Sequence, residues 1–120
     1  MNVLQSQKLV VIDVDGTISS AGGPVEADDI RALENRGIIW GILSSRSKDR
    51  ANEACETIGI KPHFIEVCRI DQRAEELRGL ASRYKADEYI YVADREVDYR
   101  EAKLAGWRFI FASSFREVSI

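Results

Sequence analysis

The fold is decided by residues 9–17, which read Leu-Val-Val-Ile-Asp-Val-Asp-Gly-Thr. The apolar, β-branched first half predicts a strand over residues 8–14 that is buried on both faces. Asp13 falls at the end of this strand and Asp15 begins the turn, and side chains two apart in an extended segment point the same way. Two such carboxylates are stable together where a cation lies between them or where one keeps its proton. The alternative is a plain strand followed by an Asp-Gly turn.

The composition predicts one globular domain over residues 1–120. The chain is 45% hydrophobic and 31% charged, and 120 residues are enough for a modest core. The net charge of −3 argues against a broad surface for nucleic acid or anionic membrane. Residues 1–17 show no signal-peptide pattern, and Cys55 and Cys68 form no CxxC pair. These features predict a cytoplasmic protein without a membrane span.

Strand and helix patterns alternate five times along the chain. Gly37 and Gly59 end two of the helical patterns, and Ser47 is a candidate helix cap. Residues 19–25, which contain Gly-Gly-Pro, predict a flexible loop. The expected strands cover residues 8–14, 38–43, 63–67, 89–93 and 107–112, and the expected helices residues 26–36, 47–58, 71–84 and 96–105, with an unassigned tail from residue 113. Such alternation predicts an α/β fold, with a parallel sheet between helices on both faces.

Polar residues follow the expected strands at one edge of this sheet. Asp13, Asp15 and Thr17 follow the first strand, and Ser44, Ser45 and Arg46 follow the second. Cys68 and Arg69 follow the third, and Asp94, Arg95 and Asp98 follow the fourth. Ligands of such sheets bind beyond the carboxyl ends of the strands. Acids that hold a divalent cation, hydroxyls and a fixed cation together suit phosphoryl transfer.

Three of these segments resemble motifs of the haloacid dehalogenase superfamily of aspartate-nucleophile phosphatases. Residues 13–17, Asp-Val-Asp-Gly-Thr, are similar to its first motif, and residues 42–46, Ile-Leu-Ser-Ser-Arg, to its second. Residues 92–98, Val-Ala-Asp-Arg-Glu-Val-Asp, resemble the fourth, with acids four apart after an apolar strand. The resemblance implies a Rossmann-like three-layer α/β/α fold with strand order 3-2-1-4-5. Because the connections are short, the chain resembles the members without a cap domain.

The resemblance also implies roles for the acids. Asp13 would be the nucleophile that becomes an aspartyl-phosphate. Asp15 would protonate the leaving oxygen and then take a proton from water, and it would lend its backbone carbonyl to the cation. Asp94 would complete a Mg²⁺ site with Asp13 and Asp15. Asp98 would bind this metal through water or hold the loop.

Phosphate binding is expected from Ser44, Ser45, Thr17 and Arg69, with Thr17 also steadying the loop. The third motif of the family is usually a lysine, and none stands at the usual distance before the fourth strand. Arg69 takes this place, Arg73 is its neighbour, and Lys85 lies further along the chain.

Several functions fit these features. The first is a Mg²⁺-dependent phosphomonoester hydrolase whose open site takes a large substrate or is covered by a neighbouring subunit, as in a tetramer. The second is a nucleic-acid end phosphatase acting on 3′-phosphates, since residues 94–107 are similar to the phosphatase domain of phage polynucleotide kinases. A third is a catalytically silent domain that only binds phosphate or a partner. A signalling receiver fits poorly, because no Asp follows the third strand and no Lys the fifth.

The remaining candidates have simpler explanations. Cys68 reads as a small apolar residue without a base to activate it, and His63, the single histidine, as structural. Trp40 and Trp107 are expected in the core, and Arg46 as a solvated charge.

Overall fold

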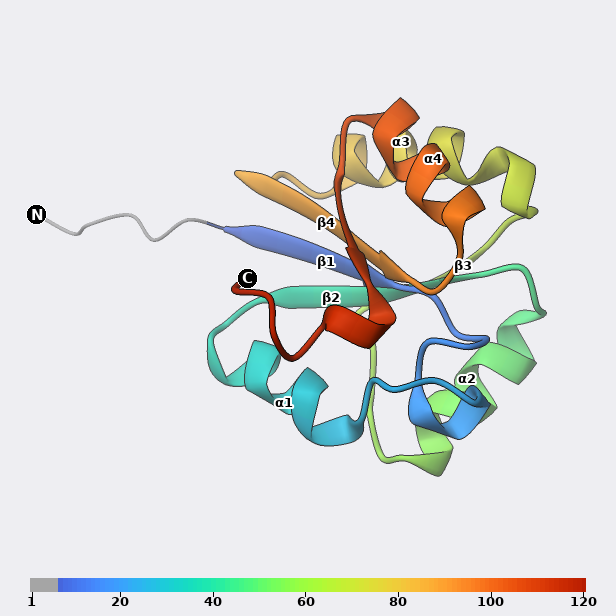
Figure 1. Ribbon diagram of the computed structural model, residues 1–120, viewed down its shortest axis with the longest axis vertical. Helices are drawn as coiled ribbons and strands as arrows, with labels where there is room; N and C mark the ends of the chain where they lie inside the picture. Colours follow the sequence, from blue (N-terminus) through green and yellow to red (C-terminus); the bar gives the residue numbers. More distant parts are fainter. Residues whose placement is uncertain (1–6) are drawn as a thin grey trace, which may run out of the picture.

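Residues 7–120, the part of the chain that the structure describes, form a five-stranded parallel sheet between two layers of helices in this computed structural model (Figure 1). Residues 1–6 of the expected domain lie outside the described residues. The strand order is β3-β2-β1-β4-β5, and all four neighbouring pairs are parallel. The strands are β1 (Lys8–Ile12), β2 (Ile39–Ser44), β3 (Ile65–Val67), β4 (Glu88–Ala93) and β5 (Arg108–Phe111). The predicted fold class and strand order are confirmed.

Within the described part of the chain, four helices cover the sheet, two on each face. They are α1 (Ala27–Asn35), α2 (Lys48–Thr57), α3 (Arg73–Arg83) and α4 (Glu96–Ala105). Short 3₁₀ turns are η1 (Ser19–Ala21), η2 (Ile70–Gln72) and η3 (Ala112–Ser114). Helices α1 and α2 lie on one side of the sheet with the C-terminal tail, and α3 and α4 on the other (Figure 1). None of the helices in residues 7–120 is long and apolar enough to cross a membrane.

Strand β1 is central and contributes to both layers of the core. Val10 and Ile12 pack into the cluster under α1 and α2, while Leu9 and Val11 pack into the cluster under α3 and α4. All four are at most 1% exposed, so the apolar run is buried on both faces as predicted. The strand ends at Ile12, two residues before its predicted end.

Helix α3 begins later than predicted, with Arg73 as its first residue. The sequence predicts that Asp71 caps the helix, but Ile70–Gln72 form the 3₁₀ turn η2 and α3 begins at Arg73. The carboxylate of Asp71 binds the guanidinium of Arg69 at 2.7 Å, so it is not available to cap the helix. Ser47 does cap α2, since its hydroxyl accepts a hydrogen bond from the backbone N–H of Arg50 at 3.3 Å.

Candidate active site

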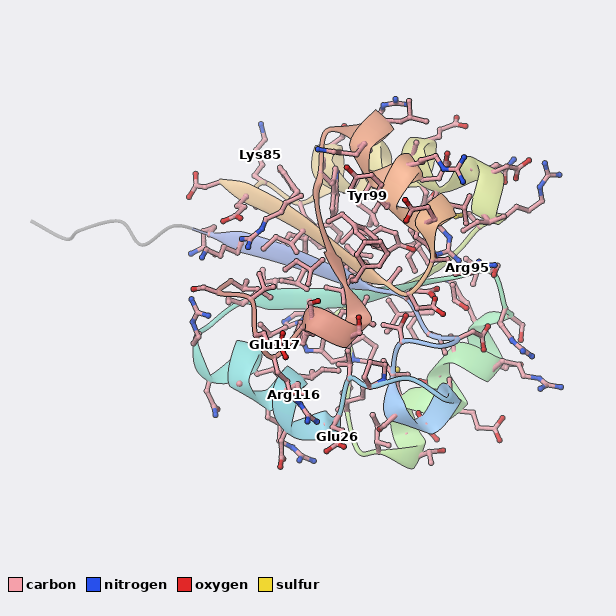
Figure 2. All side chains as sticks on the ribbon, in the orientation of Figure 1. Glu26, Lys85, Arg95, Tyr99, Arg116 and Glu117 are labelled. Atoms are coloured by element: carbon pink, nitrogen blue, oxygen red, sulfur yellow. The ribbon has the colours of Figure 1, made fainter. Side chains whose placement is uncertain are left out.

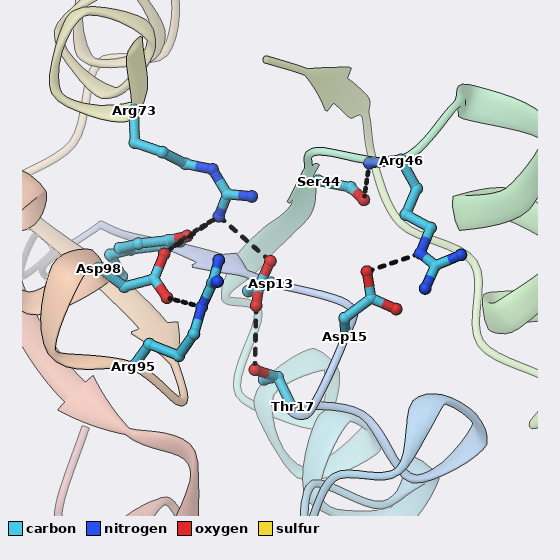
Figure 3. Close-up of polar contacts among 9 residues, drawn as sticks. Asp13, Asp15, Thr17, Ser44, Arg46, Arg73, Arg95 and Asp98 are labelled. Atoms are coloured by element: carbon cyan, nitrogen blue, oxygen red, sulfur yellow. Dashed lines mark hydrogen bonds and ion pairs between the residues drawn. The ribbon is translucent and has the colours of Figure 1, made fainter. Parts of the chain in front are cut away.

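The carboxyl ends of β1, β2 and β4 bring an acidic cluster and a hydroxyl side chain to one edge of the sheet (Figure 3). Asp13 directly follows β1, Ser44 is the last residue of β2, and Asp94 directly follows β4. Asp98 comes from the first turn of α4. Residues from distant parts of the sequence therefore meet because parallel strands end at the same edge.

Asp13 is buried at the centre of this cluster, with 3% of its surface exposed. Its Oδ1 accepts a hydrogen bond from Nη1 of Arg73 at 3.1 Å, and its Oδ2 accepts one from the hydroxyl of Thr17 at 3.4 Å. Burial raises the pKa of Asp13 to about 6; the charge of Arg73 opposes this rise, and the charge of Asp98 adds to it. At neutral pH the carboxylate is therefore mostly ionised.

Arg73, not Arg69, is the cation that contacts Asp13. Its side chain is fully buried, and Nη1 lies 3.3 Å from Oδ1 of Asp98 as well as against the hydroxyl of Tyr91. The prediction placed Arg69 at the phosphate, but 73% of its side chain is exposed and it pairs with Asp71. The physical reason is that Asp71 holds Arg69 in solvent, whereas Arg73, the first residue of α3, reaches over the sheet edge to Asp13.

Lys85 is also remote from the site. It is exposed and precedes β4, whereas Arg95 follows the carboxyl end of that strand. Figure 2 shows the two side chains at opposite ends of the sheet.

Three carboxylates are close enough to hold one metal ion. Asp13, Asp94 and Asp98 each offer an oxygen, and these oxygens all lie within 4.8 Å of one another. Oδ1 of Asp98 accepts a hydrogen bond from Tyr91 at 3.0 Å, while its buried Oδ2 accepts no hydrogen bond among residues 7–120 and lies 3.6 Å from Nε of Arg95 (Figure 3). An all-oxygen donor set in which one buried oxygen accepts no hydrogen bond fits a hard divalent cation such as Mg²⁺.

Gly16 allows Asp94 to approach this cluster. Its φ of +72° favours glycine, and a Cβ atom there would lie 2.1 Å from Oδ2 of Asp94. A side chain at residue 16 would therefore displace the carboxylate.

The carboxylate of Asp15 turns away from the acidic cluster. Its Oδ2 accepts a hydrogen bond from Nε of Arg46 at 2.8 Å, and the side chain is 46% exposed (Figure 3). Arg46 is thus an ion-pair partner, and its side chain is 52% exposed, so it is also the solvated charge that the sequence predicts. The predicted metal contact through the carbonyl of Asp15 stays a prediction.

The hydroxyl residues take different positions. Ser44 is buried, and its oxygen accepts a hydrogen bond from the backbone N–H of Arg46 at 3.0 Å, which leaves its own proton free to donate. Ser45 is exposed and lines a cavity of about 240 Å³ with Asp13, Asp15, Gly16, Asp94 and Arg95. Thr17 is buried and contacts Asp13, which suits a positioning role.

Sequence reasoning missed Tyr91 and the position of Arg73. Tyr91 lies within a buried apolar strand, where its pattern indicates core packing only, so no signal could have found its hydroxyl contact with Asp98. An arginine at the first position of a helix gives no local sign that its side chain is buried. The downstream acid at residue 98 was the one available signal, because a buried carboxylate needs a partner.

The fold is shared with solved phosphatase structures, whereas no protein-family profile and no curated protein sequence matches the chain. The core domain of a protein assigned as a phosphoglycolate phosphatase from Streptococcus pneumoniae is similar over 90% of this chain, with a TM-score of 0.69 and 19% identity. 3-Deoxy-D-manno-octulosonate 8-phosphate phosphatase from Moraxella catarrhalis, solved with magnesium, phosphate and KDO, has a TM-score of 0.61 and 25% identity over 83% of the chain. A phosphoserine phosphatase in its apo form has a TM-score of 0.64 and 16% identity over 88%.

The chain spans 80%, 64% and 86% of the lengths of these three structures, in that order. They are phosphatases of the haloacid dehalogenase type. The fold that the motifs predict is therefore confirmed by comparison as well as by the strand order.

Proposed function

We propose that this chain is a divalent-metal-dependent phosphomonoester hydrolase that works through an aspartyl-phosphate on Asp13. The proposal rests on the environment of the Asp13 carboxylate. Its buried carboxylate lies against the guanidinium of Arg73, within reach of two further acids, and beside the cavity that Ser45 lines. The predicted tetramer and the nucleic-acid end substrate stay predictions.

In the first step an oxygen of Asp13 attacks the phosphorus atom, and the bond between phosphorus and the leaving oxygen breaks. Asp15 donates the proton that the leaving oxygen needs. Ser44 donates a hydrogen bond to a phosphate oxygen, since its hydroxyl proton has no acceptor among the described residues. In the second step Asp15 takes a proton from water, which attacks the aspartyl-phosphate and frees Asp13.

Arg73 supplies the fixed positive charge for both steps. Its Nε and Nη2 are buried and have no hydrogen-bond partner within residues 7–120, so the charge of Arg73 acts from beneath the site, through its contact with Asp13. Its guanidinium also keeps Asp13 ionised against the effect of burial on the pKa. Both effects favour transfer of a negatively charged phosphoryl group to a negatively charged nucleophile.

Asp13, Asp94 and Asp98 would hold the metal ion. When bound, Mg²⁺ would neutralise charge on the transferring phosphoryl group and offset the repulsion among the acids. The Moraxella catarrhalis enzyme was solved with this ion, and the all-oxygen donor set supports the same choice here.

The test is hydrolysis of p-nitrophenyl phosphate with and without added Mg²⁺. The chain should release p-nitrophenol only with the divalent ion, and Asp13→Asn should abolish turnover. Asp28→Asn, at an exposed position on α1, is the control for loss of one negative charge. Acid quenching should trap phosphate on the wild-type chain and none on Asp13→Asn. Turnover by Asp13→Asn at the wild-type rate would show that the nucleophile is another group.

A further inference from the structure

A second cavity begins at Asp15 and extends between η1 and α2. Its volume is about 280 Å³, roughly that of nine water molecules in the liquid. The polar side chains that line it are those of Asp15, Ser20, Arg46, Arg50, Glu53 and Thr57. It is large enough for a small polar organic group.

The cavity has a fixed wall. The hydroxyl of Ser20 donates a hydrogen bond to the backbone carbonyl of Ala54 at 2.6 Å, which ties η1 to α2. Figure 1 shows these two elements side by side. The hydroxyl of Thr57 donates to the carbonyl of Glu53 at 2.8 Å, so it is already used within the helix. The charged side chains are therefore the groups left to recognise a ligand.

Asp15 belongs to both cavities. It lines the cavity beside Asp13, Asp94 and Ser45, and it also lines the second one. In the proposed reaction Asp15 donates its proton to the leaving oxygen, so the leaving group must lie next to this side chain. The second cavity is the space that continues from there.

The charges of the second cavity favour a single negative charge on the leaving group. Arg46 binds Asp15 through Nε, and its other nitrogens make no hydrogen bond to the described residues. Arg50 makes no ion pair within residues 7–120, and neither does Glu53. With Asp15 protonated, as the proposed first step requires, the charges of Arg46, Arg50 and Glu53 sum to +1. A doubly charged phosphate would be repelled by Glu53, whereas one carboxylate can bind the guanidinium groups in the two-pronged geometry that arginine favours.

We propose that this cavity is the leaving-group subsite and that it selects phosphate monoesters whose leaving group carries a carboxylate, with Arg50 and Arg46 as its receptors. The proposal rests on the proposed phosphatase function for the placement of the leaving group. Glu53 limits the total negative charge that the subsite accepts. Arg50 determines specificity and takes no part in bond breaking.

The test compares ω-carboxyalkyl phosphates with n-alkyl phosphates and alkane bisphosphates of the same chain lengths. We expect kcat/KM for the best carboxyalkyl phosphate to exceed that for its alkyl partner at least tenfold. Arg50→Gln should reduce this ratio at least fivefold, and Glu53→Gln should increase it. Arg100→Gln removes the same charge from α4 on the other face of the sheet and should leave the ratio at its wild-type value.

Binding measurements separate this proposal from the proposed activity. The affinities of the same compounds for Asp13→Asn and for Asp13→Asn combined with Arg50→Gln are measured by calorimetry, which needs no turnover. Tighter binding of the carboxyalkyl phosphate that is lost with Arg50→Gln supports the subsite even if no ester is hydrolysed. Equal affinity for alkyl and carboxyalkyl phosphates, or a preference for bisphosphates, would overturn it even if alkyl phosphates are hydrolysed.

Discussion

Replacement of Arg73 by methionine should lower the free energy of unfolding far more than the same change at Arg69. Arg73 is fully buried and binds the carboxylates of Asp13 and Asp98, with Nη1–Oδ1 distances of 3.1 and 3.3 Å. Methionine fills much of the same volume but leaves the buried Asp13 without a cation, and Asp98 keeps only its 3.6 Å contact with Arg95. Loss of one partner from a buried ion pair typically costs about 3–5 kcal/mol of unfolding free energy. Arg69 pairs with Asp71 where both side chains are mostly in solvent, so its loss should change stability much less.

The assay is urea unfolding of wild type, Arg73→Met and Arg69→Met, followed by tryptophan fluorescence at pH 7.5 and pH 5. With a slope of about 2 kcal/mol per M urea, the midpoint of Arg73→Met should fall by roughly 1.5–2.5 M. The deficit should shrink at pH 5, because Arg73 lowers the pKa of Asp13 and its removal lets this acid protonate more easily. Equal midpoints for the two variants at pH 7.5 would refute the reasoning that the buried guanidinium holds the two acids together.

Three further predictions concern the same cluster. In EDTA, ionisation of Asp13 should lower the free energy of unfolding by up to about 3 kcal/mol as the pH rises from below 3.8 through about 6, because the pKa of Asp13 is higher in the folded than in the unfolded protein. Urea midpoints of Asp13→Asn should lack this part of the pH dependence, and a profile identical to that of the wild type would contradict the prediction. Tyr91→Phe should weaken competitive inhibition by inorganic phosphate severalfold, because Arg73 and Asp98 lose their contacts with the Tyr91 hydroxyl. Tyr89→Phe, which loses only contacts to backbone groups, should lower the melting temperature and leave the inhibition constant for phosphate unchanged. Gly16→Ala should weaken Mn²⁺ binding at least tenfold in an EPR titration. The control Gly37→Ala, with nearly the same φ but nothing within 4 Å of the added methyl group, should bind Mn²⁺ like the wild type. An equal loss of affinity in both variants would show that backbone strain alone is responsible.

The order of elements could be predicted from the sequence because local signals and packing agree. The Gly37 and Gly59 positions both have positive φ and follow helices, as their residue type indicates. Gly41 in β2 indicates a close approach, and the ring of Phe64 lies about where its Cβ would be, at 2.3 Å. The start of α3 was predicted wrongly because Asp71 has the residue type of a helix cap but binds Arg69 instead. A side chain with two possible partners cannot be assigned from its type alone.

The candidate site was less predictable than the fold for a related reason. Strand ends are fixed by the sheet, so the positions of Asp13 and Ser44 follow from the topology. The cation comes from the first residue of α3 instead, and the sequence does not indicate which nearby arginine faces the sheet edge. Arg69 and Arg73 are four residues apart and carry the same charge, yet one is in solvent and the other has no exposed surface. Burial, which sequence patterns do not specify for a single arginine, makes the difference.

The charge balance of the buried cluster connects its stability to its proposed chemistry. Asp13, Asp98 and Arg73 are each at most 3% exposed, and the two carboxylates share the guanidinium of Arg73, while the exposed Arg95 pairs with Asp98 at 3.6 Å. The buried charges therefore sum to −1 when both acids are ionised, and the nearby exposed Asp94 and Arg95 add one charge of each sign. Burial favours protonation of Asp13, whereas the proposed attack on phosphorus requires its ionised form. A divalent cation among the three acids resolves this conflict, because it favours the ionised nucleophile and offsets the repulsion among the acids. On this argument the residues that destabilise the metal-free fold near neutral pH are the same ones that make Asp13 reactive when the ion binds.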